Sequence, residues 1–214
     1  MNLDLVALVA DADMQNTLKT LLAQRAPALG IRSGLRYRTL RHPQRDPGVV
    51  HQAAAFLRPY LGRAQHALVM LDWEGSGAEN RFADPEGLEA DLETALARNG
   101  WPREQAAAIV IQPELEVWTW ASLQHLAQVI ALPRAAVRAV LAQVERDEHG
   151  KPLRPKETLG KLLRAARHPH SPALFVKLAQ RVGLQRCQDR AFHKLRATLQ
   201  RWFPAAYSAR PPES

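Results

Sequence analysis

The strongest constraint on the fold is a regular alternation of short apolar segments with longer amphipathic ones. The predicted strands are residues 3–9, 35–40, 67–71 and 107–111. Segments with helical spacing of apolar side chains separate them, at residues 14–24, 49–61 and 85–99. Nearly unbroken apolar runs are typical of strands buried on both faces, as in parallel sheets. The order therefore predicts an α/β fold with a mostly parallel sheet and flanking helices.

The pattern changes after residue 132. The remaining segments have helical spacing only, at residues 135–145, 156–167, 172–182 and 189–202. We expect an α/β domain over residues 1–132, a basic, all-helical subdomain over residues 133–207 and a disordered tail at 208–214.

The charge of the chain is concentrated at its end. Residues 151–214 hold 14 Lys and Arg against 3 Asp and Glu, within a chain of net charge +8. This asymmetry favours DNA or RNA as a partner, and solvated helix faces are the alternative explanation. Arg190, Lys194 and Arg201 share one side of the last predicted helix. The candidate phosphate contacts are Lys156, Lys161, Arg164, Arg186, Arg190, Lys194 and Arg201.

Composition also limits the cellular setting. No run is long and apolar enough to span a membrane, and Asp4 and Asp11 interrupt the start of the chain where a signal peptide would be apolar. We therefore expect a cytoplasmic protein without membrane contact. Cys187 is the single cysteine, which excludes an internal disulfide and a cysteine-based zinc site.

Acidic residues follow two of the predicted strands. Asp72 and Glu74 end the strongest strand, and Asp11 and Asp13 follow the first. In extended geometry Asp72 and Glu74 would face one side and share a Mg²⁺ or Mn²⁺ ion, with Asp11 or Asp13 as a third ligand. The alternative is a plain strand end with solvated acids. Asp13 is also a plausible N-cap of the helix that follows.

Two further segments carry additional candidates for the site. Glu114 and Glu116 fall in a first helical turn, where they favour the helix dipole whatever else they do. His42 and Asp46 lie in "HPQRDPG", whose prolines and glycine predict a loop, and a turn-forming role is sufficient for Asp46.

Several motifs in the chain resemble those of Toprim-like proteins from bacterial defence islands. They are "VADADM", "HPQRDPG", "LVMLDWEGSG", "IQPELEVWTW", "RPKETL" and the long segment that begins "SPALFVKLAQ". Within that group the chain most resembles an accessory protein of the methylation-associated phage-defence systems. The resemblance implies a Toprim-like fold, a metal site at Asp72, Glu74 and Asp11 or Asp13, and other defence-system proteins as partners.

The chain departs from the Toprim pattern at one position. That pattern has Glu directly after the first strand, where this chain has Ala10, so the shorter Asp11 or Asp13 would have to substitute. Ala10 favours a catalytically degenerate component of an anti-phage system that acts on or binds nucleic acid. The first alternative is an active Mg-dependent nuclease. The second is a protein–protein adaptor or a nucleotide-sensing module, the latter with Trp73 and Trp118 near the cleft.

Overall fold

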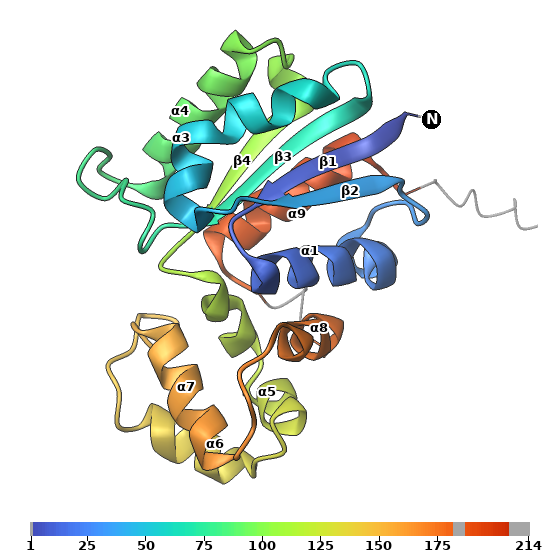
Figure 1. The fold of residues 1–214 in the computed structure, drawn as a ribbon. Coiled ribbons are helices and arrows are strands. Elements are labelled where there is room, and N and C mark those ends of the chain that lie inside the picture. The colour runs from blue at the N-terminus through green and yellow to red at the C-terminus, as the bar shows by residue number, and fades with distance from the viewer. Residues whose placement is uncertain (1, 182–186, 206–214) are drawn as a thin grey trace, which may run out of the picture.

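A computed structural model describes residues 2–181 and 187–205 and contains the predicted sheet (Figure 1). Its strands are β1 (Leu3–Val9), β2 (Tyr37–Arg41), β3 (Ala64–Asp72) and β4 (Ala106–Ile111). All neighbouring strands are parallel, in the order β2-β1-β3-β4. The predicted α/β fold with a parallel sheet is therefore confirmed.

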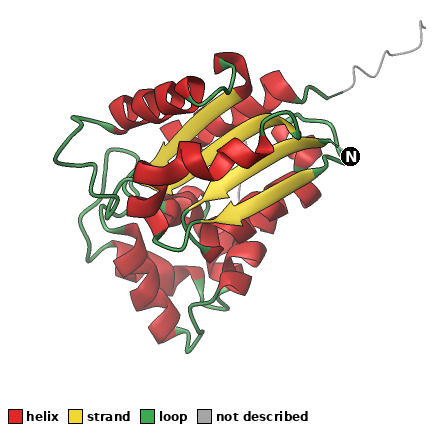
Figure 2. Cartoon of the chain, turned by 45° about the horizontal axis from the view of Figure 1, so that its top comes forward, coloured by secondary structure: helices red, strands yellow, loops and turns green. Residues whose placement is uncertain are grey.

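Helices cover both faces of this sheet (Figure 2). One face carries α1 (Ala12–Gln24) and α9 (Arg190–Trp202), and the other carries α3 (Arg45–Leu57) and α4 (Pro85–Arg98). Alternate residues of β1 supply the two cores: Leu5 and Ala7 pack toward α1, whereas Val6 and Leu8 pack toward α3. Because both faces are buried, the strand sequence is apolar at consecutive positions.

The connections that leave β1 and enter β3 run on opposite faces of the sheet. The chain passes from β1 through α1 to β2 on one side, and then crosses to β3 on the other side of β1. In open parallel sheets, ligands bind in the crevice at the carboxyl ends of two strands that part in this way. The residues that follow β1 and end β3 therefore lie where a site is expected.

The chain after β4 forms a helical lobe before it returns to the sheet (Figure 1). The elements of the lobe are η3 (Leu115–Ala121), α5 (Leu123–Val129), α6 (Arg134–Leu141), α7 (Pro155–Ala165) and α8 (Pro172–Arg181). The remaining short helices are α2 (Ala26–Leu29), η1 (Arg58–Tyr60) and η2 (Arg103–Gln105).

The packing of the last helix differs from the predicted division of the chain into two parts at residue 132. We expected α9 in a helical subdomain over residues 133–207, but it packs against β4 and shares a core with β1 and α1. Trp202 Nε1 also donates to the carbonyl oxygen of Glu104 at 2.8 Å. Helical spacing shows that α9 is amphipathic but does not show which apolar surface it covers.

The structure of residues 42–48 also differs from the prediction, which was a loop throughout. α3 begins at Arg45 and includes Pro47 and Gly48. Proline is tolerated in a first helical turn because the N–H groups there have no intrahelical partner. Gly48 is required for packing, since a Cβ at this position would lie 1.9 Å from His42 Nδ1.

Within the described ranges, no helix combines the length and the apolar character needed to cross a membrane. Two predictions fall outside these ranges, namely the phosphate contact of Arg186 and the disordered tail at residues 208–214.

Candidate functional site

The sheet brings two of the predicted acids together at its carboxyl edge. Asp11 follows β1, Asp72 ends β3, and these strands are neighbours with Val9 paired to Met70. The negative charge of Asp11 is one of the causes that raise the pKa of Asp72. The predicted proximity of the two strand ends is therefore present in the structure.

Asp11, and not Asp13, caps helix α1. Its Oδ1 accepts a hydrogen bond from Met14 N at 2.9 Å, which corrects the predicted cap by two residues. Asp13 lies instead in the first turn, where its carboxylate is half-buried. Burial and then the charge of Asp11 raise the pKa of Asp13.

Asp72 is a buried acid at the end of β3. Its Oδ1 accepts a hydrogen bond from Leu115 N at 2.9 Å, and the residue is 7% exposed. Burial is the main cause that raises its pKa well above the ordinary value, and the charges of Asp46 and Glu116 add to it. Its neutral form is therefore favoured unless positive charge is supplied.

Asp46 joins the site from the start of α3. Its Oδ1 accepts a hydrogen bond from the backbone N of Asp72 at 2.8 Å. Burial and the charge of Asp11 raise its pKa, although the hydrogen bond from Asp72 opposes them. Asp46 thus connects α3 to the end of β3, and does more than form the turn predicted for it.

Two glutamates approach the same place from the segment after β4. Glu114 Oε1 accepts from Lys156 N at 3.0 Å, and its Oε2 lies 3.3 Å from Lys156 Nζ. Burial raises the pKa of Glu116 to about 7, against the attraction of Lys156. These six carboxylates form the acidic cluster: Asp11, Asp13, Asp46, Asp72, Glu114 and Glu116.

His170 reaches the acidic cluster from the segment before α8. Its Nε2 lies 3.7 Å from Asp13 Oδ2 and 3.9 Å from Glu116 Oε1. His170 is not among the residues predicted for the site. Its contact with Asp13 depends on how the helical lobe packs on the sheet, which spacing along the chain does not reveal.

Glu74 does not share the site with Asp72. It lies in an exposed turn, followed by Gly75 at φ 80°, and its backbone N donates to the Pro113 oxygen at 2.9 Å. The expected pair assumed extended backbone through residue 74. The strand ends at Asp72, so the rule that alternate side chains share a face no longer applies.

His42 is held by neighbouring polar groups and is buried. Its Nδ1 accepts from Gln44 N at 3.1 Å, so Nε2 carries the proton and faces Gln52 Oε1 at 3.3 Å. Both ring nitrogens are therefore engaged, and this arrangement leaves neither free to bind a metal. The candidate role of His42 as a ligand is replaced by a role in fixing the loop.

The donor chemistry of the acidic cluster fits a hard divalent cation. Carboxylate oxygens are the ligands that Mg²⁺ and Mn²⁺ prefer. Among the residues that the structure describes, no three His, Cys, Asp or Glu side chains converge on a position that would hold a metal ion. Binding a cation therefore requires at least one acidic side chain to turn toward it.

Ion pairs correct the predicted nucleic-acid face of α9. Arg190 NH1 lies 2.8 Å from Glu89 Oε2, and its Nε lies 3.0 Å from Glu86 Oε1. Lys194 Nζ lies 3.1 Å from Glu89 Oε2 and 2.8 Å from Glu93 Oε1. The prediction assumed that this face lacks counter-charges, whereas α4 supplies them.

The other basic candidates are divided between the acidic cluster and the surface. Lys156 pairs with Glu114. Lys161 and Arg164 on α7 and Arg201 on α9 are exposed. Lys156 is exposed as well, so four of the predicted phosphate contacts in the described residues lie at the surface, and one of these four is paired with an acid.

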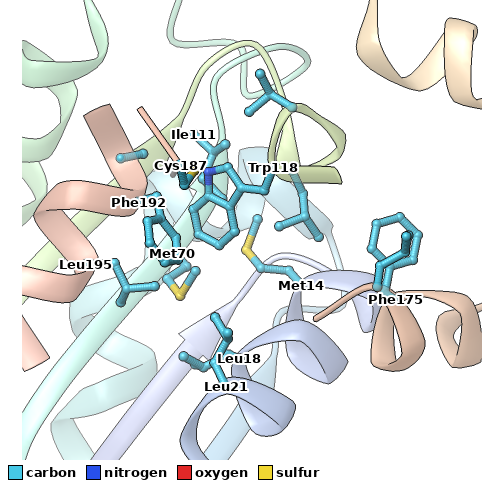
Figure 3. Packing of buried hydrophobic residues seen from close by; sticks show 14 of the residues in the cluster. Met14, Leu18, Leu21, Met70, Ile111, Trp118, Phe175, Cys187, Phe192 and Leu195 are labelled. Atoms are coloured by element: carbon cyan, nitrogen blue, oxygen red, sulfur yellow. The ribbon is translucent and has the colours of Figure 1, made fainter. Parts of the chain in front are cut away.

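Trp118 lies in the core, where it is 4% exposed. Figure 3 shows its ring between Phe192 and Met14, and the ring centroids of Trp118 and Phe192 are 5.3 Å apart. Its Nε1 donates to Asp189 Oδ1 at 2.8 Å. The stacking role considered for Trp118 in nucleotide sensing therefore does not fit this position.

Comparison of the chain with models of known protein families, with curated proteins and with solved structures finds no match.

Proposed function

We propose that the protein binds Mg²⁺ or Mn²⁺ in the acidic cluster and acts on nucleic-acid phosphodiesters as a component of a bacterial anti-phage defence system. The main support is electrostatic: burial and neighbouring charges raise the pKa of Asp13, Asp46 and Asp72 together. Burial is the main cause of these shifts and repulsion between the acids adds to it, so a bound cation would offset both costs. The defence setting rests on the resemblance to Toprim-like proteins.

The residues have distinct roles in this proposal. Asp11, Asp46 and Asp72 would hold the cation, with Asp13 beside them. A bound divalent cation supplies Lewis-acid chemistry, because it polarises a phosphate oxygen and acidifies a bound water. Glu116, whose pKa is about 7, is suited to take up or release a proton near neutral pH.

A second candidate is a catalytically degenerate binding protein. Two acids of the cluster already accept backbone hydrogen bonds, Asp72 from Leu115 and Asp46 from Asp72. These bonds give both carboxylates a structural role without a cation. Ala10, at the position of the Toprim glutamate, favours the same candidate.

A Mn²⁺ titration followed by electron paramagnetic resonance separates the two candidates. We expect saturable binding by the wild type and at least about tenfold weaker binding by Asp72→Asn and Asp46→Asn. Asp91→Asn is the matched control, because Asp91 is an exposed acid on α4. Cleavage of DNA and RNA in the presence of Mn²⁺ should decrease in the same two variants.

Failure to bind Mn²⁺ in this titration would favour the second candidate. Absence of saturable Mn²⁺ binding, with nucleic acid or partner proteins still bound, would support the degenerate protein and refute the cation site. The defence role is tested by introducing Asp72→Asn into the native locus and measuring phage plating. Unchanged protection would show that the acidic cluster is not needed for defence.

A further inference from the structure

An open hollow of about 410 Å³ lies at the carboxyl ends of β1 and β2. Most of its lining comes from Ala10, Asp11, Ala12, Arg41, His42 and Arg45. Its volume is within the range of small-molecule sites, about 300–1,000 Å³. Asp11 belongs both to this lining and to the acidic cluster, so the hollow adjoins the proposed cation site.

Two arginines make the lining of the hollow basic. Arg41 ends strand β2 and Arg45 begins α3, and both are exposed. The positive charge of Arg45 opposes the rise in the pKa of Asp13, which shows that it acts on the acidic cluster. Asp11 is the one acid among the lining residues, so the two arginines outnumber it.

Arg45, the first residue of α3, has an unusual backbone conformation. Arg45 N donates to the His42 oxygen at 3.1 Å, and Arg45 adopts a left-handed φ of 51°. This conformation is strained for a residue with a Cβ, and glycine would avoid the strain. These features fix the backbone of Arg45 beside the hollow that it lines.

We infer that this hollow binds a phosphate group of the substrate and that Arg41 and Arg45 hold it. The planar N–H donors of arginine match phosphate oxygens in geometry and in charge. The inference rests on the proposed function, since it names the substrate group next to the acidic cluster. Both a nucleic-acid strand and a free nucleotide carry this group.

The test is a ³¹P NMR titration of the full chain with inorganic phosphate, in EDTA so that no cation contributes. We expect Arg41→Gln and Arg45→Gly each to weaken phosphate binding about tenfold, because each removes a charge-assisted hydrogen bond. Arg45→Gly also relieves the left-handed strain and should fold. Arg167→Gly is its matched control, because Arg167 is an exposed arginine with the same φ of 51°. For Arg41 the control is Arg38→Gln, an exposed arginine on the same strand.

Two outcomes overturn the inference: no phosphate binding by the wild type, or equal weakening in the two control variants. Mn²⁺ binding, measured in parallel, is expected to survive Arg41→Gln. If phosphate binds through Arg41 and Arg45 but Mn²⁺ does not bind, the inference stands and the proposed function fails. Repeating the titration with single-stranded DNA and with a mononucleotide identifies the carrier: tighter binding of DNA that depends on Arg45 supports a strand, and equal binding supports a free nucleotide.

Discussion

At the scale of single residues, Glu116 titrates near neutral pH because it is buried beside other acids. Burial raises its pKa from 4.5 to about 7, although Lys156 attracts its charged form. Between these values the folded protein retains a proton that the unfolded chain has released. Stability should therefore fall as the pH rises through this window, by at most about 3 kcal/mol from this group.

Glu116→Gln should remove this part of the pH dependence. The free energy of unfolding of the wild type and of the variant is measured in urea at about pH 5 and about pH 8. The difference between the two proteins in its change with pH is the contribution of Glu116. Glu157→Gln, which changes an exposed glutamate on α7, is the control. Identical pH dependence in the wild type and Glu116→Gln would show that Glu116 titrates normally.

Asp72→Asn should stabilise the protein in the absence of metal. Asparagine keeps the oxygen that accepts from Leu115 N and needs neither a buried charge nor the uptake of a proton on folding. At about pH 8 we expect the free energy of unfolding to rise by about 1–3 kcal/mol, while Mg²⁺ should stabilise only the wild type. A loss of stability in metal-free buffer would mean that the charge of Asp72 is already compensated within the fold.

At the scale of elements, α4 and α9 close the exposed edge of β4. Glu89 Oε1 accepts from Val110 N at 2.8 Å, and Arg190 NH2 donates to the Val110 oxygen at 2.8 Å. Glu93 Oε1 accepts from Ala108 N at 3.1 Å. Unpaired backbone groups on an edge strand invite pairing with other chains, and these side chains satisfy them.

Arg190→Glu should therefore destabilise the fold. It would place a third acid beside Glu86 and the buried Glu89, and leave the Val110 oxygen without its donor. We expect a loss of about 3–5 kcal/mol in urea unfolding, as for breaking a buried ion pair. Arg201→Glu, at an exposed position on the same helix, should change stability by less than about 0.5 kcal/mol. Equal effects of the two reversals would contradict the structural role of Arg190.

At the scale of the whole molecule, one continuous core joins the sheet to the helical lobe. It contains Leu5 of β1, Trp118 of η3, Leu159 of α7 and Leu195 of α9. A fragment of residues 1–132 lacks α9 and would expose the part of the sheet that α9 covers, including one face of β4. We expect it to show no cooperative thermal unfolding by near-ultraviolet circular dichroism, and a sharp native-like transition would establish a domain boundary near residue 132.

Sequence patterns predicted the sheet well because buried parallel strands leave apolar runs that a short window detects. They also placed Asp11 and Asp72 at one edge, since parallel strands share a carboxyl end. They named Asp46 only as an additional candidate and gave His170 no role, because the contacts of both residues depend on packing between distant segments. Glu74 was misplaced for a local reason: the strand ends at Asp72, and alternation of side chains ends with it.

Anomalous diffraction from crystals soaked in Mn²⁺ tests the central claim most directly. We predict a manganese peak at the carboxyl end of β3, about 2 Å from a carboxylate oxygen of Asp72 and bound also by Asp11 or Asp46. The peak should be absent from crystals of Asp72→Asn soaked in the same way. Wild-type crystals saturated with Mn²⁺ that show no peak at the acidic cluster would contradict the proposed cation site.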